Sequence, residues 1–150
     1  MALGNTPDNR GFRRVSGGWG TMYMDGVEIF ECTEISAEIE VQRSDVLVGN
    51  NVDSKITGLA GSGSFTLGHV YTRHINNALT KLKEGHDPRF TMSIVLDDPD
   101  AVGGQREQID IGNVWINNLN LAGFTRGEIV EKEYEFGFTP DDADIAEGIY

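Results

Sequence analysis

The chain has little of the chemistry on which most catalytic and metal sites depend. Its 150 residues include a single cysteine, Cys32, and only three histidines. One cysteine excludes an intramolecular disulfide, and a lone thiol in a strand-like stretch is more typical of packing than of a nucleophile. The scattered histidines give no pair of zinc ligands at a standard spacing. The sequence therefore predicts a protein with no cofactor, no metal site and no catalytic centre.

Long apolar runs and basic residues are also scarce. No run approaches the roughly 20 apolar residues that span a membrane, and the first residues lack the apolar segment of a signal peptide. We therefore expect no membrane insertion and synthesis in the cytoplasm. The net charge is −12, from 24 acidic residues and 12 lysines and arginines. Because proteins grip nucleic acid by neutralising phosphates, this balance argues against tight binding, although nucleic acid could still slide past.

The few basic residues are unevenly placed. Residues 1–18 read as a polar N-terminal arm and carry Arg10, Arg13 and Arg14 against one aspartate. Residues 128–150 carry eight acidic residues and one lysine, and residues 140–150 read as an acidic tail. Opposite charges on one chain can attract neighbouring copies, so the three arginines are candidates for inter-subunit contacts. The alternative is a solvated surface with a loose terminus.

Most of the chain alternates apolar and polar residues with a period of two. The pattern covers residues 33–42, 89–97, 106–116 and 128–139 and predicts strands with one face in a core. Asp25-Gly26, between residues 19–24 and 27–31, predicts a hairpin with a type I′ turn. Gly112 predicts a bulge, and residues 117–125 predict a short strand. The glycines of residues 58–68 lack the lysine of a phosphate-binding loop and favour close backbone approach or a bulge.

One stretch has a helical period. Ile75, Ala78, Leu79 and Leu82 form the stripe of an amphipathic helix, which we place at residues 72–85 with Thr72 as its N-cap. The length fits one domain. The sequence therefore predicts a single, mainly β domain with one helix.

Residues 43–57 interrupt the alternation with Gly49, Asn50 and Asn51, and we expect a long inter-strand loop there. Loops of this length in compact domains are usually functional or disordered. Val46, Leu47 and Val48 form an apolar run within this polar stretch. We therefore expect contact with something outside the protomer, with folding back onto the protomer's own core as the alternative.

Two further groups have a functional and a structural interpretation. Asp97, Asp98 and Asp100 have ligands suited to calcium, but their spacing matches no EF-hand, and aspartate is also typical of turns. Trp19 and Trp115 have the side chains of a sugar-binding platform, but tryptophan also packs in cores and interfaces.

Five segments, in this order and spacing, resemble a known family. They are GTMYMDG (20–26), TGLAGSGSFT (57–66), KLKEGHDPRFTM (81–92), IVLDD (94–98) and EKEYEFGFTPDD (131–142). The chain is similar from Gly20 to about Asp142 to the tail tube protein of PBSX-type contractile phage tails and phage-tail-like bacteriocins, which is related to the type VI secretion tube protein. The resemblance implies a β-sandwich or half-barrel with one α-helix on its flank.

The resemblance also implies a function. Such proteins form hexameric rings that stack into a hollow tube inside a contractile sheath, with sheath, baseplate and tape-measure proteins as partners and DNA as non-specific transiting cargo. We therefore expect a structural protein of a virion or phage-like particle, with acidic and small polar side chains facing the lumen. The inter-ring contact is assigned to Val46, Leu47, Val48, Asn50 and Asn51.

The alternative from another class is a monomeric β-sandwich binding module for sugar or protein, with Trp19 or Trp115 as its platform. An enzyme would need a pocket with titratable groups of perturbed pKa, and the sequence offers no strong candidate.

Overall fold

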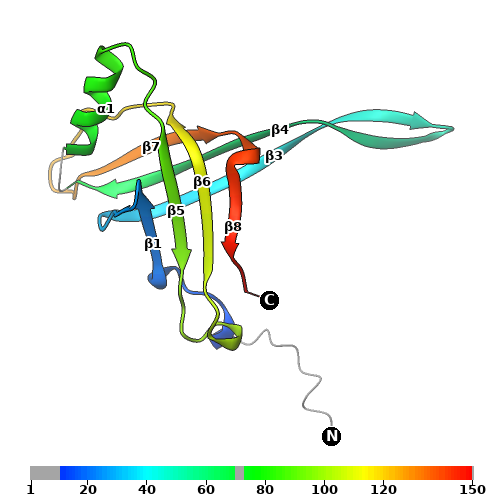
Figure 1. The fold of residues 1–150 in the computed structure, drawn as a ribbon, viewed down its shortest axis with the longest axis horizontal. Coiled ribbons are helices and arrows are strands. Elements are labelled where there is room, and N and C mark those ends of the chain that lie inside the picture. The colour runs from blue at the N-terminus through cyan, green and yellow to red at the C-terminus, as the bar shows by residue number, and fades with distance from the viewer. Residues whose placement is uncertain (1–10, 70–72, 150) are drawn as a thin grey trace, which may run out of the picture.

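The computed structural model describes residues 11–69 and 73–149. These residues form a mainly β fold with one α-helix, as the sequence predicts (Figure 1). All strand pairs are antiparallel. The elements are β1 (Gly20–Met24), β2 (Val27–Glu28), β3 (Cys32–Val48), β4 (Asn51–Gly68), α1 (Arg73–Lys83), β5 (Phe90–Leu96), β6 (Glu107–Ile116), β7 (Glu131–Phe138) and β8 (Ala143–Glu147).

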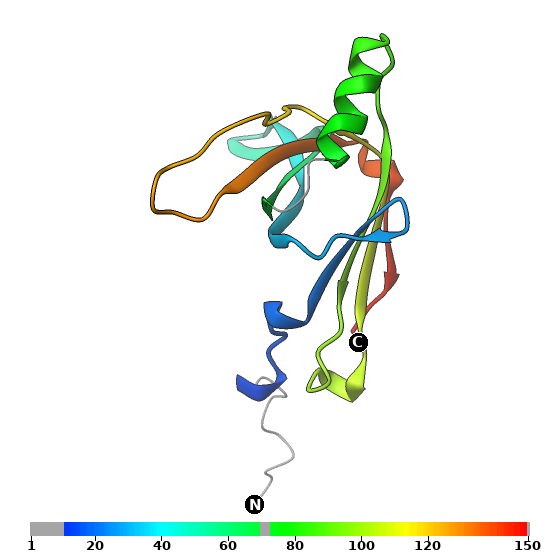
Figure 2. The ribbon, with the colours of Figure 1, turned by 90° about the vertical axis from the view of Figure 1, so that its left-hand side faces the viewer.

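The strands follow one hydrogen-bonded path in the order β2-β1-β5-β6-β7-β4-β3, and β8 pairs with β6 beside it. Strand β6 joins the two halves of this path. Its first part pairs with β5 and β8, whereas Trp115 and Ile116 pair with β7. Between the Met92–Ile111 pair and the Phe90–Val114 pair, the register of β5 and β6 slips by one residue. The extra residue lies at Gly112 and Asn113, and Asn113 has φ 51°. The bulge predicted at Gly112 is therefore confirmed. Figure 2 shows the same ribbon from the side, with β7 crossing over β5 and β6.

The hydrophobic core lies between the two halves of the sheet. Strand β7 shows how the sequence builds it: Tyr134, Phe136 and Phe138 are buried, whereas Glu133 and Glu135 are exposed. The rings of Phe65 and Tyr134 stack with centroids 5.3 Å apart, within the range of favourable aromatic pairs. The buried cluster consists of Met22, Phe65, Met92, Ile111, Val114, Tyr134, Phe136 and Phe138.

Glycines in β4 let this core close. A Cβ atom on Gly63 would lie 2.2 Å from the carbonyl oxygen of Ser36 and 2.4 Å from the ring of Phe136. Both distances are far below van der Waals contact, so only glycine fits between β3 and the aromatic rings. The close approach predicted for residues 58–68 is confirmed.

The hairpin at Asp25-Gly26 is also confirmed. Met24 pairs with Val27, and Asp25 and Gly26 have φ of 52° and 80°. Positive φ at both central positions is what a type I′ turn requires. The side chain of Asp25 also accepts a hydrogen bond of 2.8 Å from the Thr91 amide, which ties the turn to β5.

The prediction of a long inter-strand loop at residues 43–57 is wrong. Strand β3 continues to Val48, β4 starts at Asn51, and a two-residue turn with φ 63° at Gly49 joins them. Glycine at the first central position fits a type II′ turn. The alternation is lost here because this part of the hairpin projects from the body and buries neither face. The Gly49-Asn50 pair is itself a signal for a two-residue hairpin turn, and the loop prediction does not take it into account.

Two expectations near the C-terminus are also corrected. Residues 143–147 form β8, which pairs with β6 and includes an Ile109–Ile145 pair, so the acidic tail contributes a strand to the sheet. Residues 117–125 contain no strand. The backbone there bonds to β7 where the Asn117 amide donates to the Glu135 carbonyl over 2.8 Å and where the Leu121 carbonyl accepts from Lys132 Nζ over 3.1 Å. Within the described ranges, no helix is long and apolar enough to cross a membrane.

Candidate assembly surfaces

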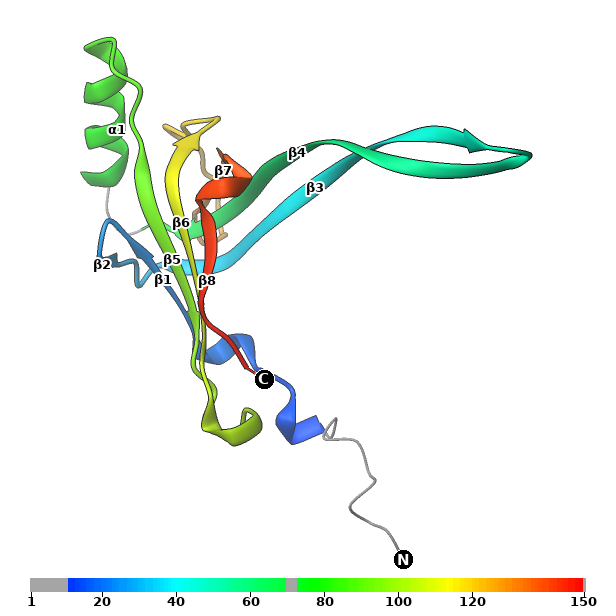
Figure 3. The same cartoon turned by 45° about the vertical axis from the view of Figure 1, so that its right-hand side comes forward.

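The outer half of the β3–β4 hairpin, residues 43–56, projects far from the body (Figures 1 and 3); we call it the ribbon. The structure brings the predicted contact residues together at its tip, namely Val46, Leu47, Val48, Asn50 and Asn51. Leu47 is 78% exposed and Val52, its partner across the hairpin, 67%. The ribbon does not fold back onto its own core. Exposed apolar side chains that cluster on a projecting element make the ribbon tip a candidate interaction site.

The register of the ribbon separates its two faces. Leu47 pairs with Val52, whereas Val46 pairs with Asp53 and Val48 pairs with Asn51. Because directly paired residues share a face, Leu47 and Val52 form one apolar face at the tip. Val46 and Val48 lie on the opposite face, beside polar partners. The three valine and leucine residues therefore cannot all meet one flat surface.

The outer edge of β3 is a second candidate surface. Strand β3 spans 17 residues and pairs with β4 on one side. Among the described strands, none pairs with its other edge, because β3 ends the path of the sheet. A long edge of unpaired amide and carbonyl groups is a template for pairing with another chain.

The third surface is an acidic face formed by β3, β4 and β7. Thr66 pairs with both Glu34 and Glu133, and Ser64 pairs with both Ser36 and Glu135, so these side chains share the face opposite the core. Lys132 lies on the other face and is buried. The acidic residues of this face are Glu34, Glu38, Glu40, Glu131, Glu133 and Glu135, all exposed.

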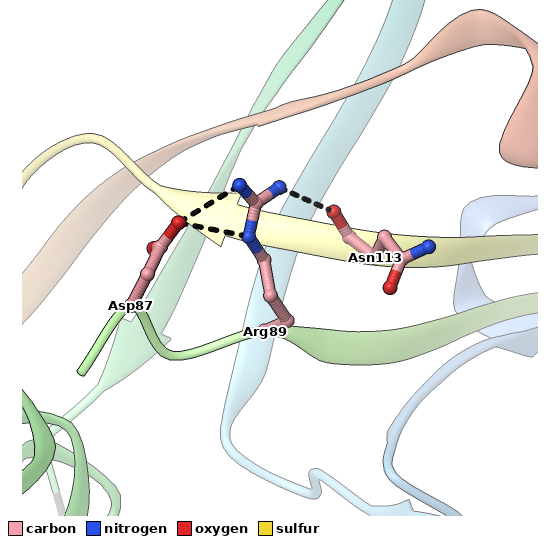
Figure 4. Close-up of polar contacts among 3 residues, drawn as sticks. All are labelled: Asp87, Arg89 and Asn113. Carbon is pink, nitrogen blue, oxygen red and sulfur yellow. Dashed lines mark hydrogen bonds and ion pairs between the residues drawn. The ribbon is translucent and has the colours of Figure 1, made fainter.

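Trp115, a candidate sugar platform, lies against Arg89. Figure 4 shows the polar contacts of Arg89 with Asp87 and Asn113. The guanidinium of Arg89 lies 4.8 Å from the centre of the Trp115 ring. It donates from Nε and Nη2 to Asp87 Oδ2 over 3.1 and 2.8 Å, and from Nη1 to the Asn113 carbonyl over 3.3 Å. Trp115 also packs so closely on Gly137 that a Cβ there would lie 2.6 Å from Nε1. These contacts favour packing over ligand binding at Trp115.

Trp19, the other candidate platform, is 54% exposed. It closes a short 3-10 turn, Gly17–Trp19, and its carbonyl accepts a 3.4 Å hydrogen bond from the Asp97 amide.

The carboxylate cluster at residues 97–100 anchors the N-terminal arm. Asp98 is buried, and its two oxygens accept hydrogen bonds of 2.9 Å from the amides of Ser16 and Asp100. The Arg13 guanidinium donates to the carbonyls of Asp100 and Ala101 over 3.3 and 3.4 Å. Asp98 begins a turn, as aspartate's turn preference predicts, but its side chain is buried and not solvated. Arg13 therefore contacts its own protomer and Arg14 is exposed, while Arg10 lies outside the described residues.

Cys32 lies in β3, beside the core. Burial raises the pKa of its thiol, and the Glu31 carboxylate adds to the increase. The thiol also donates to the Glu34 carbonyl over 3.5 Å. A raised pKa lowers the thiolate fraction, which supports the packing role expected for this side chain.

A partly open cavity of about 430 Å³ lies beneath α1, and no sequence motif predicts it. Its walls come from β1, β2, the end of β4, α1 and the segment after β6, and include Met24, Val27, Ile29, Phe90 and Leu119. Lys132 also lines it and donates from Nζ to the Leu121 carbonyl over 3.1 Å. The cavity exists because strands and helix from distant parts of the chain meet there without filling the space.

Comparison with known proteins gives consistent matches over most of the chain. It is 30% identical to the uncharacterized protein YqbM of Bacillus subtilis and 29% identical to the phage-like element PBSX protein XkdM of the same organism. Each match spans 136 residues, or 89% of this chain and 90% of the relative.

The fold is similar to a chain in the extended sheath–tube complex of an extracellular contractile injection system. The TM-score is 0.71 at 9% identity, over 90% of this chain and 93% of the other. At this identity the likeness concerns the fold alone. The sequence model described as phage tail tube protein matches residues 9–147, and the chain therefore belongs to the phage tail tube protein family.

Proposed function

We propose that this chain is the subunit of the hollow inner tube of a contractile phage or phage-like tail, with a structural and not a catalytic role. In this proposal, hexameric rings stack into a tube that conducts DNA or ions. The observation that carries it is the unpaired edge of β3, 17 residues long, in a chain of the tail tube family.

Ring closure follows from the sheet edges. A heterologous contact, in which one edge of a subunit meets a different edge of the next, closes into a ring when the rotation allows it. The edge of β3 would pair with a strand of the neighbouring subunit, which removes the exposed edge in the same step. The half-barrels would then join into a continuous barrel around the lumen.

The ribbon provides the contact between rings. Its tip extends beyond the body of the protomer (Figure 3) and exposes Leu47 and Val52. Burying an exposed leucine or valine contributes about 1.5–3 kcal/mol for a full side chain. Repeated around a ring, this contribution would be large enough to hold successive rings together.

The acidic face of β3, β4 and β7 is suited to the lumen. Glutamates there would repel the phosphates of passing DNA, and the serine and threonine side chains between them carry no positive charge that could bind phosphate. DNA would be a transiting cargo that the tube does not bind. The sheath contact belongs to this proposal too, since the similar chain of known structure comes from a sheath–tube complex; baseplate and tape-measure proteins are the remaining partners.

Electron microscopy of the purified, concentrated chain tests the tube. Wild-type protein is expected to form hollow tubes of uniform width with sixfold end views. Leu47→Asp should keep the wild-type thermal stability, because the side chain is exposed, yet fail to form tubes. Leu47→Met is the matched control and should form them, because it keeps an apolar side chain of similar volume. Tube growth of Leu47→Asp at the wild-type rate would contradict the role of the ribbon.

Sedimentation with DNA tests the lumen. Wild-type tubes should leave short duplex DNA in the supernatant at low salt. A variant with Glu38→Lys, Glu133→Lys and Glu135→Lys should carry DNA into the pellet and release it at high salt. Equal behaviour of both tubes would place the acidic face away from the lumen.

A further inference from the structure

The cavity beneath α1 and the tip of the ribbon lie at opposite ends of the protomer. In Figures 1 and 3, α1 and β2 lie at one end of the molecule and the turn between β3 and β4 at the other. A surface at one end and a complementary surface at the other make a head-to-tail contact, which propagates from copy to copy without limit.

The cavity is suited to an apolar guest. Met24, Val27, Ile29 and Phe90 line it, and Val27 is 53% exposed at the surface of β2. Apolar walls with a few polar groups at the margin are the usual composition of a binding pocket. An exposed valine beside an open apolar cavity is surface that a partner can remove from water.

The ribbon tip has the matching shape and chemistry. Leu47 and Val52 form one apolar face beside the turn, both more than half exposed. The tip is only a two-stranded hairpin wide, so it can enter an opening that a full sheet cannot.

The charged residues near the ribbon tip and around the cavity bear on the same docking. Counted from the turn, the acidic residues Asp53 and Asp45 come first, and the basic residues Lys55 and Arg43 lie farther back. Lys81, in the last turn of α1, and Lys132 line the cavity, together with the carboxylates of Asp25 and Glu31. An inserted tip would therefore bring its carboxylates toward a lysine at the mouth.

We propose that the cavity beneath α1 receives the ribbon tip of another copy of this chain, with Leu47 and Val52 inside and Asp45 or Asp53 facing Lys81. This inference rests on the proposed tube, because it names the receptor for the inter-ring contact. It makes each protomer both donor and acceptor, so every ring presents tips on one side and cavities on the other.

Crosslinking in assembled tubes tests the docking. In a Cys32→Ser parent, the double variant Leu47→Cys with Val27→Cys is treated with a short bismaleimide and separated on a denaturing gel. The two positions lie at opposite ends of one protomer, so they can react only between copies. Docking predicts a ladder of covalent dimers, trimers and longer chains. The control pair, Leu47→Cys with Ile145→Cys, places the second thiol on exposed β8 and should give no ladder.

The outcomes separate the two proposals. Failure of the wild-type chain to form tubes refutes the proposed function, and the docking with it. Tubes without a ladder from Leu47→Cys and Val27→Cys leave the function standing and overturn the docking alone. A ladder from Phe124→Cys with Val27→Cys in its place would show that the exposed connection between β6 and β7 occupies the cavity instead.

A charge exchange gives a second test that needs no crosslinker. Lys81→Glu should slow tube growth at low salt, because Asp45 or Asp53 would then face a carboxylate. Adding Asp45→Lys and Asp53→Lys to Lys81→Glu should restore growth toward the wild-type rate, and the effect should fade at high salt as the charges are screened. Absence of rescue at low salt would overturn the docking orientation.

Discussion

Replacing Gly63 with alanine tests how tightly the acidic face is fixed to the core. Gly63 lies in β4, pairs with Ala37 of β3 and Phe136 of β7, and faces the aromatic core. The new Cβ would lie 2.2 Å from the Ser36 carbonyl oxygen and 2.4 Å from the Phe136 ring. The ring can tilt, but the oxygen belongs to the backbone of a paired strand, so β3 must move.

The expected loss in the free energy of unfolding of Gly63→Ala follows from overpacking of the core. Extra methyl groups in a filled core destabilise by about 1–3 kcal/mol and occasionally more. With one contact to backbone and one to a fully buried ring, we expect about 3 kcal/mol for Gly63→Ala. Alanine also restricts the unfolded chain, which offsets at most about 1 kcal/mol at positions without strain. At about 2–4 °C per kcal/mol for a chain of this size, the midpoint of thermal unfolding should fall by about 6–12 °C.

The assay is urea unfolding of the unassembled protein followed by circular dichroism. Gly123→Ala is the matched control, because a Cβ there meets nothing within 4 Å. We expect it to stay within about 0.5 kcal/mol of wild type, as surface substitutions usually do. If Gly63→Ala unfolded at the same urea concentration as Gly123→Ala, the close packing of β3, β4 and β7 described above would be wrong.

Two further predictions concern the arm and the core. Asp98→Ala should lower the free energy of unfolding by about 2–3 kcal/mol, because two buried amide hydrogen bonds lose a charged acceptor. It should also speed tryptic cleavage after Arg13 and Arg14. Cleavage at the wild-type rate would contradict the anchoring role of Asp98. Burial raises the pKa of Tyr134, so the stability tied to its protonated form is complete below the ordinary value of about 10 and is lost as the pH rises above it. Urea midpoints between about pH 8 and 11 should therefore fall more steeply for wild type than for Tyr134→Phe, and parallel curves would contradict this.

Much of the fold was predictable because its signals are local. The Asp25-Gly26 turn requires positive φ at two successive residues, and aspartate and glycine are both residue types that adopt it. The alternation of β7 follows from one buried and one solvated face, and it appears directly as Tyr134 and Phe136 set between glutamates. Helix α1 was recognisable from its apolar stripe.

The errors came from segments whose conformation depends on distant partners. Residues 143–147 carry one large apolar side chain, Ile145, and backbone pairing with β6 makes them a strand. The ribbon lacks alternation because no face of it is buried within the protomer. Arg13 looked free to reach a neighbour, yet the loop after β5 supplies the carbonyls that bind it.

The sequence by itself determined a mainly β domain with one helix, an apolar run at residues 46–48 and an excess of acidic over basic residues, because turn chemistry, periodicity and charge are properties of short stretches. Only the tertiary structure decided that glutamates nearly 100 residues apart share one face, and that α1 covers a cavity at the end opposite the ribbon. The physical reason is strand register: which side chains meet depends on which backbones pair, and that pairing is set by the packing of the whole core.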